Sequence, residues 1–237
     1  YWADALAPSV RVLERGQDRQ LAALEAPVIG LLLRGGAVVA VHERGAVLIA
    51  ADGAVTALTP WPAGTLQAVC NGEGEAVWAA MRLPEAGAAV GRVREDGGFD
   101  VLWSVGEPIA SLRWRAEDQT LYASAPGSGA ILLMQLGSAA IRRLATVPKG
   151  SGQVGGLAFD AQGGIWAALC DGWAVMRFTA AGSLDRVVGL PVPCATDLAF
   201  GGAAQDRLYV TTSRHSVPLD TLTIAPLSGR LLAFAPS

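Results

Sequence analysis

Residues 154–169 read VGGLAFDAQGGIWAAL: an apolar stretch, a turn of aspartate and glycine, and a second apolar stretch with an early tryptophan. Short apolar runs bounded by turn residues are typical of strands that are buried on both faces. The same pattern recurs in four other segments, at residues 28–41, 66–80, 109–124 and 196–212. The sequence therefore predicts five β-hairpins of one repeat.

The repeat has the period of a propeller blade. Successive repeats lie 37, 44, 45 and 41 residues apart when one position in each first strand is taken as equivalent, namely Leu33, Cys70, Trp114, Phe159 and Phe200. A third and a fourth strand are expected after each hairpin. Four strands in about 40 residues predict an all-β fold, a six-bladed β-propeller that forms a single domain over residues 1–237. A helical fold is disfavoured because no 3.6-residue period persists over a helix-length window.

Both ends of the chain resemble parts of a blade. Residues 1–4, 9–14 and 20–25 are expected to form the second, third and fourth strands of the first blade, and residues 230–235 the third strand of the sixth. An open edge on a ring of blades is a liability that closure normally removes. We therefore expect the natural chain to begin upstream of Tyr1, with the first strand of the first blade located there.

Composition and charge exclude several classes of protein. The 237 residues are 51% hydrophobic and 16% charged, which is incompatible with intrinsic disorder. The net charge is −3, so a nucleic-acid partner is not expected. No apolar run is long enough for a membrane span, and no membrane partner is expected. Only Lys149 of the 18 basic residues is lysine, which indicates a GC-rich, bacterial genome.

The cysteines and the N-terminus give an expectation for the compartment. Cys70, Cys170 and Cys194 are odd in number and far apart, so we expect neither a zinc pair nor a disulfide framework. The first four residues have no basic or apolar segment of the kind that begins a signal peptide. Both observations predict a cytoplasmic protein.

Residues 155–234 carry a resemblance to a known family. In order they contain GGLAFDAQGGIWAAL, WAVMRFTAAG, LPVPCATDLAFGG, DRLYVTTSR and APLSGRLLAF. This order resembles the gluconolactonase/regucalcin (senescence marker protein) family. The resemblance implies a six-bladed propeller that opens sugar lactones, with one divalent cation such as calcium or zinc in the central channel.

The resemblance also implies which positions would hold the cation. The family's glutamate ligand would lie upstream of Tyr1, its asparagine corresponds to Ala110, and its aspartate corresponds to Gly155. Residues 64–68 correspond to the family's substrate-binding Arg and Asn and contain neither. Calcium prefers about six or more oxygen ligands, several of them charged. The motifs of the metal site are thus degraded, and a divalent cation is expected to bind weakly or not at all.

The remaining polar residues supply the candidate site. Asp197 is the candidate catalytic residue and metal ligand, because it is the only acid at its position in the five repeats. Side chains expected on or near the same face are candidates for binding a small-molecule ligand at the channel mouth: Gln67, Glu107, Ser111 and Asp171. Thr196, one residue earlier in the repeat, is the residue that corresponds to Ala110 and Gly155, where the resemblance places cation ligands. Because successive strand side chains alternate in direction, Asp197 reaches the channel only if its strand begins irregularly.

Three functions stay open at this point. The first is a gluconolactonase-like, metal-dependent hydrolase of sugar lactones, and the second is a non-catalytic propeller that binds a small molecule or a protein. The third is a different small-molecule hydrolase with Asp197 and an upstream glutamate as metal ligands. A structural alternative for Asp197 itself is that its carboxylate caps backbone amides. The oligomeric state and the substrate are not indicated by the sequence.

Overall fold

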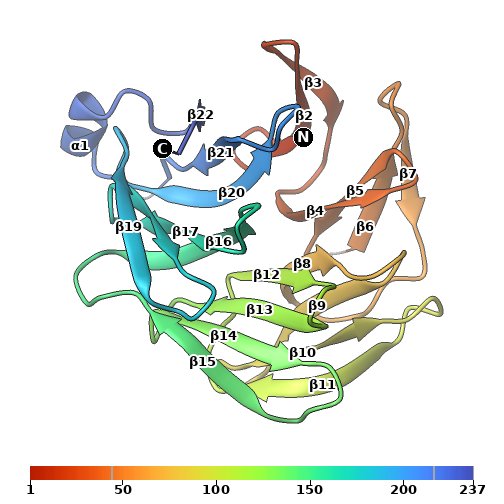
Figure 1. The fold of residues 1–237 in the computed structure, drawn as a ribbon. Coiled ribbons are helices and arrows are strands. Elements are labelled where there is room, and N and C mark those ends of the chain that lie inside the picture. The colour runs from red at the N-terminus through yellow and green to blue at the C-terminus, as the bar shows by residue number, and fades with distance from the viewer. Residues whose placement is uncertain (44, 216, 237) are drawn as a thin grey trace. The chain divides into compact units, whose positions relative to one another are not determined.

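The computed structural model describes residues 1–43, 45–215 and 217–236, in two compact units, Tyr1–Thr120 and Leu121–Ser237. Neighbouring strands run antiparallel, as in the third and fifth sheets, and the strands of each sheet follow one another along the chain. Figure 1 shows the sheets in succession from the red N-terminal strands to the blue C-terminal ones. In the described residues, four sheets have four strands and two have three. This is a six-bladed β-propeller, and the predicted all-β fold is confirmed.

The first unit contains three whole sheets and the first strand of the fourth. The first sheet is β1 (Trp2–Asp4), β2 (Ser9–Glu14) and β3 (Gln17–Ala23). The second is β4 (Val28–Arg34), β5 (Ala37–His42), β6 (Gly45–Ile49) and β7 (Val55–Leu58). The third is β8 (Leu66–Asn71), β9 (Val77–Arg82), β10 (Ala88–Val93) and β11 (Phe99–Val105), and the fourth begins with β12 (Ser111–Arg115).

The second unit continues the fourth sheet and adds two more. The fourth sheet continues with β13 (Thr120–Ala125, whose first residue still belongs to the first unit), β14 (Ala130–Gln135) and β15 (Ile141–Thr146). The fifth is β16 (Gln153–Phe159), β17 (Ile165–Cys170), β18 (Ala174–Phe178) and β19 (Leu184–Gly189). The sixth is β20 (Ala195–Gly201), β21 (Arg207–Thr212) and β22 (Leu231–Phe234), and a short helix α1 (Leu219–Ile224) precedes β22.

The first strands of neighbouring blades pack together within each unit. In the first unit β4 contacts β8, and β8 contacts β12; in the second unit β16 contacts β20. Aromatic rings pack between neighbouring blades. Trp78 is 1% exposed and stacks on Trp114 at 5.2 Å between ring centres. Trp166 is 2% exposed and meets Phe200 edge-on.

A single aspartate organises the hairpin between β16 and β17. The Oδ1 atom of Asp160 accepts the backbone N–H groups of Gln162 and Gly164, at 3.0 and 2.8 Å. Its Oδ2 atom accepts the indole N–H of Trp166 at 2.8 Å and the Nε of Arg177 at 2.6 Å. The turn geometry predicted for Asp160 is present, and the carboxylate also neutralises an arginine two strands away.

The prediction that the cysteines form no disulfide is wrong. Cys170 and Cys194 are disulfide-bonded, and Cys70 is a buried free thiol. Cys170 ends β17 and Cys194 immediately precedes β20, two strands that contact each other. The repeat thus brings together residues that are 24 positions apart in the chain. Because structural disulfides persist mainly in oxidising compartments, the cysteines no longer argue for a reducing cytoplasm.

Among the described residues, no helix has the length and apolar character needed to cross a membrane.

Candidate functional site

A β-bulge interrupts the beginning of the first strand in four blades. The register shifts between Val28 and Gly30 in β4, between Leu66 and Ala68 in β8, and between Ala195 and Asp197 in β20. In β16 two residues are skipped, between Val154 and Leu157. Bulges re-aim side chains and are common beside functional sites. The irregular strand start that Asp197 requires in order to leave the regular alternation is therefore present.

Asp197 lies just after the unpaired bulge residue Thr196, and both residues are exposed. The backbone N–H of Asp197 donates to the Thr211 hydroxyl at 3.0 Å, and that hydroxyl lies 3.2 Å from the Asp197 carbonyl oxygen. The Thr196 and Thr211 hydroxyls are 2.8 Å apart. Two threonines therefore fix the backbone that carries the carboxylate.

The carboxylate of Asp197 rests against the neighbouring blade. A Cβ atom on Gly156 would lie 1.9 Å from Asp197 Oδ1, so this position on β16 tolerates only glycine without movement. Asp197 Oδ1 also accepts the backbone N–H of Leu198 at 2.9 Å. The structure thus contains the amide cap that the structural alternative predicted, on a side chain that is nevertheless exposed.

Three of the other candidates gather at the beginning of β12, in the first unit. Gln67 is the extra residue of the β8 bulge, and its Oε1 accepts the Ile109 N–H at 3.0 Å. Its Nε2 is buried and has no hydrogen-bond partner within the described part of the chain. Glu107 is half-buried just before this contact, and Ser111 is buried just after it. Gln67 therefore ties two blades together, which is a structural use of a predicted ligand-binding residue.

Asp171 is the fourth candidate for ligand binding, and it lies in the second unit. It follows the disulfide-bonded Cys170 in the turn between β17 and β18, where it is exposed and has a φ of +60°. The disulfide joins this turn to Cys194, three residues before Asp197. The structure therefore places Asp171 and Asp197 on two segments that a covalent bond links.

Two polar residues of the first strands are used structurally. Burial raises the pKa of the Cys70 thiol to about 12, although the nearby Arg113 opposes this. A buried thiol with a high pKa is a poor nucleophile. Asn71, the single asparagine of the chain, ends β8. Its amide exchanges two hydrogen bonds with the Leu33 backbone of β4, at 2.9 and 3.0 Å.

The residues at the strand beginnings do not fit a hard divalent cation. Ala110 and Gly155 offer no side-chain oxygen, and the Gly155 carbonyl accepts the Ser124 hydroxyl at 2.6 Å. Within the described residues, no three His, Cys, Asp or Glu side chains come together as a metal-binding group. Calcium needs several charged oxygens, and this chain brings a single carboxylate, Asp197, to that position of the repeat.

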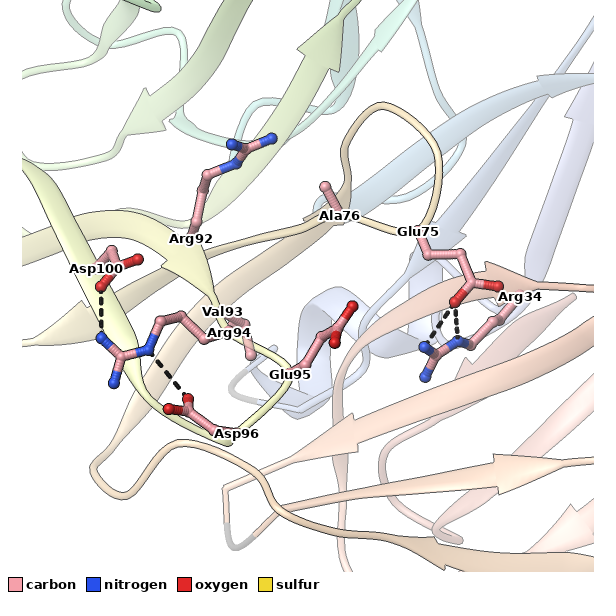
Figure 2. Close-up of a pocket in the computed structure, with 9 residues that line it drawn as sticks. All are labelled: Arg34, Glu75, Ala76, Arg92, Val93, Arg94, Glu95, Asp96 and Asp100. Carbon is pink, nitrogen blue, oxygen red and sulfur yellow. Dashed lines mark hydrogen bonds and ion pairs between the residues drawn. The ribbon is translucent and has the colours of Figure 1, made fainter.

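Sequence reasoning missed a charged cavity in the first unit. The cavity has a volume of about 640 Å³ and lies among three hairpin turns, with Arg34, Glu75, Arg92, Arg94, Asp96 and Asp100 among its lining residues. Figure 2 shows two ion-paired groups, Arg34 with Glu75 and Arg94 with Asp96 and Asp100. The segment 92–100, RVREDGGFD, gives the sequence signal, because it groups both charges around a glycine turn.

These blades and their bulged first strands define the fold as a six-bladed β-propeller. A family model described as the SMP-30/gluconolactonase/LRE-like region matches residues 1–214. The chain therefore belongs to this family, as its sequence motifs predicted.

Curated relatives match over shorter segments. The chain is 38% identical over 82 residues to a 6-deoxy-6-sulfogluconolactonase from Pseudomonas putida. The matched segment covers 35% of this chain and 28% of the relative. The chain is also 33% identical over 75 residues to regucalcin from Oryctolagus cuniculus, and this matched segment covers 31% of the chain and 25% of the relative. Each match spans less than a third of the relative's length.

Solved structures share the fold over most of the chain. Regucalcin from Agrobacterium tumefaciens, described as a calcium-binding protein, has a TM-score of 0.78 at 19% identity, covering 97% of this chain and 83% of that one. A gluconolactonase from Xanthomonas campestris has a TM-score of 0.75 at 24% identity, covering 89% and 77%. At these identities the likeness concerns the fold.

Proposed function

We propose that the protein hydrolyses a sugar-type lactone at the bulged beginning of β20, with Asp197 as the general base. Family membership supports the reaction class, since a relative is named as a sugar lactonase. The observation that carries the proposal is the position of Asp197. It is an exposed carboxylate on a β-bulge, with its backbone held by Thr211.

Hydrolysis of a lactone by this route requires one carboxylate and one water molecule. The Asp197 carboxylate accepts a proton from a water molecule, whose oxygen attacks the lactone carbonyl carbon. The ring C–O bond then breaks, the departing alkoxide takes up a proton, and the product is an open-chain hydroxy acid. A positioned general base contributes about a hundredfold or more to such a reaction. Because the metal ligands do not fit, no step is assigned to a cation.

A panel of five- and six-membered sugar lactones tests the proposal. Acid release is followed in weak buffer with a pH indicator, and the spontaneous hydrolysis rate is subtracted. Asp197→Asn keeps the shape and should lower kcat by about a hundredfold. Asp206→Asn, at the other end of the β20–β21 hairpin, is the matched control and should keep the wild-type rate. An unchanged rate in Asp197→Asn would remove Asp197 from the mechanism.

The missing ligand oxygens favour a second function, a non-catalytic binding module. Ala110 and Gly155 stand where the resemblance places a cation's side-chain ligands. On this alternative, no lactone is hydrolysed above the spontaneous rate, with or without added calcium or zinc. Calorimetric titration with the same lactones would still show saturable binding.

The cytoplasmic location remains a prediction.

A further inference from the structure

Two blades contain equivalent hairpins, which allows one to be compared with the other. In the fifth blade the Asp160 N–H donates to the Gly164 carbonyl, and in the third blade the Gly72 N–H donates to the Ala76 carbonyl. Six residues beyond Asp160 and Gly72 stand Trp166 and Trp78. Each tryptophan pairs with an arginine on the third strand: Trp166 with Arg177, and Trp78 with Arg92. Gly72 therefore occupies the position of Asp160.

In the fifth blade the arginine is fully neutralised. Asp160 bonds the Trp166 indole and the Arg177 guanidinium, as described above, and Asp185 is a second partner of Arg177 at 2.9 Å. The Arg177 side chain is 15% exposed and that of Asp160 is 7% exposed. The pair of carboxylates thus satisfies a nearly buried cation.

In the third blade the corresponding arginine, Arg92, has no carboxylate partner among the described residues. Gly72 has no side chain, and Asp100, which is opposite Arg92 in the strand register, gives its carboxylate to Arg94 at 2.8 Å. The Arg92 guanidinium lies over the Trp78 ring, 5.2 Å from its centre, and forms no hydrogen bond or ion pair with the described residues. The Trp78 indole N–H is buried and has no partner among them either.

The unpaired arginine lines the cavity of about 640 Å³. Figure 2 shows the Arg92 side chain extending away from both ion-paired groups in this cavity. Ala76, which closes the hairpin over Gly72, lines the same cavity. The Arg92 guanidinium therefore offers unbonded N–H donors to the cavity. The buried indole N–H of Trp78 lies beside Gly72, which is next to Ala76 of the cavity lining.

We propose that this cavity binds a small carboxylate anion, which takes the place that the Asp160 carboxylate holds in the fifth blade. The Arg92 guanidinium pairs with the anion through two parallel hydrogen bonds, the geometry that guanidinium and carboxylate prefer. The Trp78 indole N–H donates the third bond. A Cβ on Gly72 would lie 2.8 Å from Trp78 Nε1, so the indole now rests against the bare glycine and moves when the anion enters.

Acetate is the probe for this site, titrated against the ¹⁵N-labelled protein at constant ionic strength with sodium chloride. The indole N–H resonance of Trp78, assigned by its loss in Trp78→Phe, should shift and saturate. Arg92→Gln should weaken acetate binding by about tenfold or more, because a charge-assisted pair is lost. Arg143→Gln, on β15, is the control and should bind as the wild type does.

Gly72→Asp gives the decisive second variant, because it supplies the carboxylate from within the chain. It should abolish the acetate-dependent shift and place the Trp78 resonance near its acetate-bound position. Gly72→Ala adds a Cβ without the charge and separates crowding from charge. Absence of a saturable shift in the wild type would overturn the proposal. So would wild-type affinity in a folded Gly72→Asp or Arg92→Gln variant.

Discussion

At the level of single residues, the carboxylate of Asp160 accepts hydrogen bonds from two backbone amides, one indole and one guanidinium. Burial disfavours its charged form, but hydrogen bonds from Arg177, Trp166 and Gly164 outweigh this and hold the pKa of the carboxyl below its usual value. A lowered folded-state pKa stabilises the protein above the ordinary pKa of the group, and the stabilisation is lost as pH falls through the folded value.

Asp160→Asn should therefore destabilise the protein near neutral pH by about 2 kcal/mol, because two donors lose their ionised acceptor. Urea unfolding at a series of pH values measures the difference from the wild type. The difference should shrink as pH falls below the ordinary pKa of aspartate. A difference that stays constant down to strongly acidic pH would contradict the assigned ion pair.

Gly156 tests the placement of Asp197. Because a Cβ there would lie 1.9 Å from Asp197 Oδ1, Gly156→Ala must displace the carboxylate. We expect lactone hydrolysis to fall by about tenfold or more, the scale of a misplaced catalytic group. Gly189→Ala is the control, because a Cβ at Gly189 would meet no atom within 4 Å. Wild-type kcat in Gly156→Ala would show that the carboxylate has no part in the reaction.

At the scale of the element, the sequence predicts hairpins better than it predicts their irregularities. The turn residues of 154–169 and the apolar runs around them predict β16 and β17, because a strand buried on both faces needs that pattern. The extra residue Thr196 leaves no such mark, because a bulge is a shift between partners. The unpaired Arg92 is likewise recognised only from the structure, because the sequence pattern does not predict that Asp100 pairs with Arg94.

The disulfide is the covalent tie between two elements, the end of β17 and the beginning of β20. Closing a loop of 24 residues stabilises a protein by about 3 kcal/mol in the chain-entropy description. A thiol reductant should therefore lower the melting temperature by about 6–12 °C. The double variant Cys170→Ser with Cys194→Ser should melt at the same temperature with or without reductant. A wild-type melting temperature that is the same with and without the reductant would show that the disulfide does not stabilise the fold.

At the scale of the whole molecule, the chain has the family's fold, while its described residues include no cluster of three metal-binding side chains. The resemblance assigns two of the cation's ligands to Ala110 and Gly155, and neither residue has a side-chain oxygen. We therefore expect calcium to bind much more weakly than it does to a relative that has these ligands. Calorimetric titration with calcium measures this, beside an intact relative as the reference. Equal affinity would show that other groups of the chain hold the ion.

The proposed function assigns lactone hydrolysis to Asp197 acting as a general base without a bound cation. The most direct measurement is the rate of lactone hydrolysis by the wild type and by Asp197→Asn, each before and after treatment with a metal chelator. The proposed mechanism predicts that the chelator leaves the wild-type rate unchanged and that Asp197→Asn lowers the rate by about a hundredfold in both conditions. A wild-type rate that the chelator abolishes and added calcium restores would contradict it.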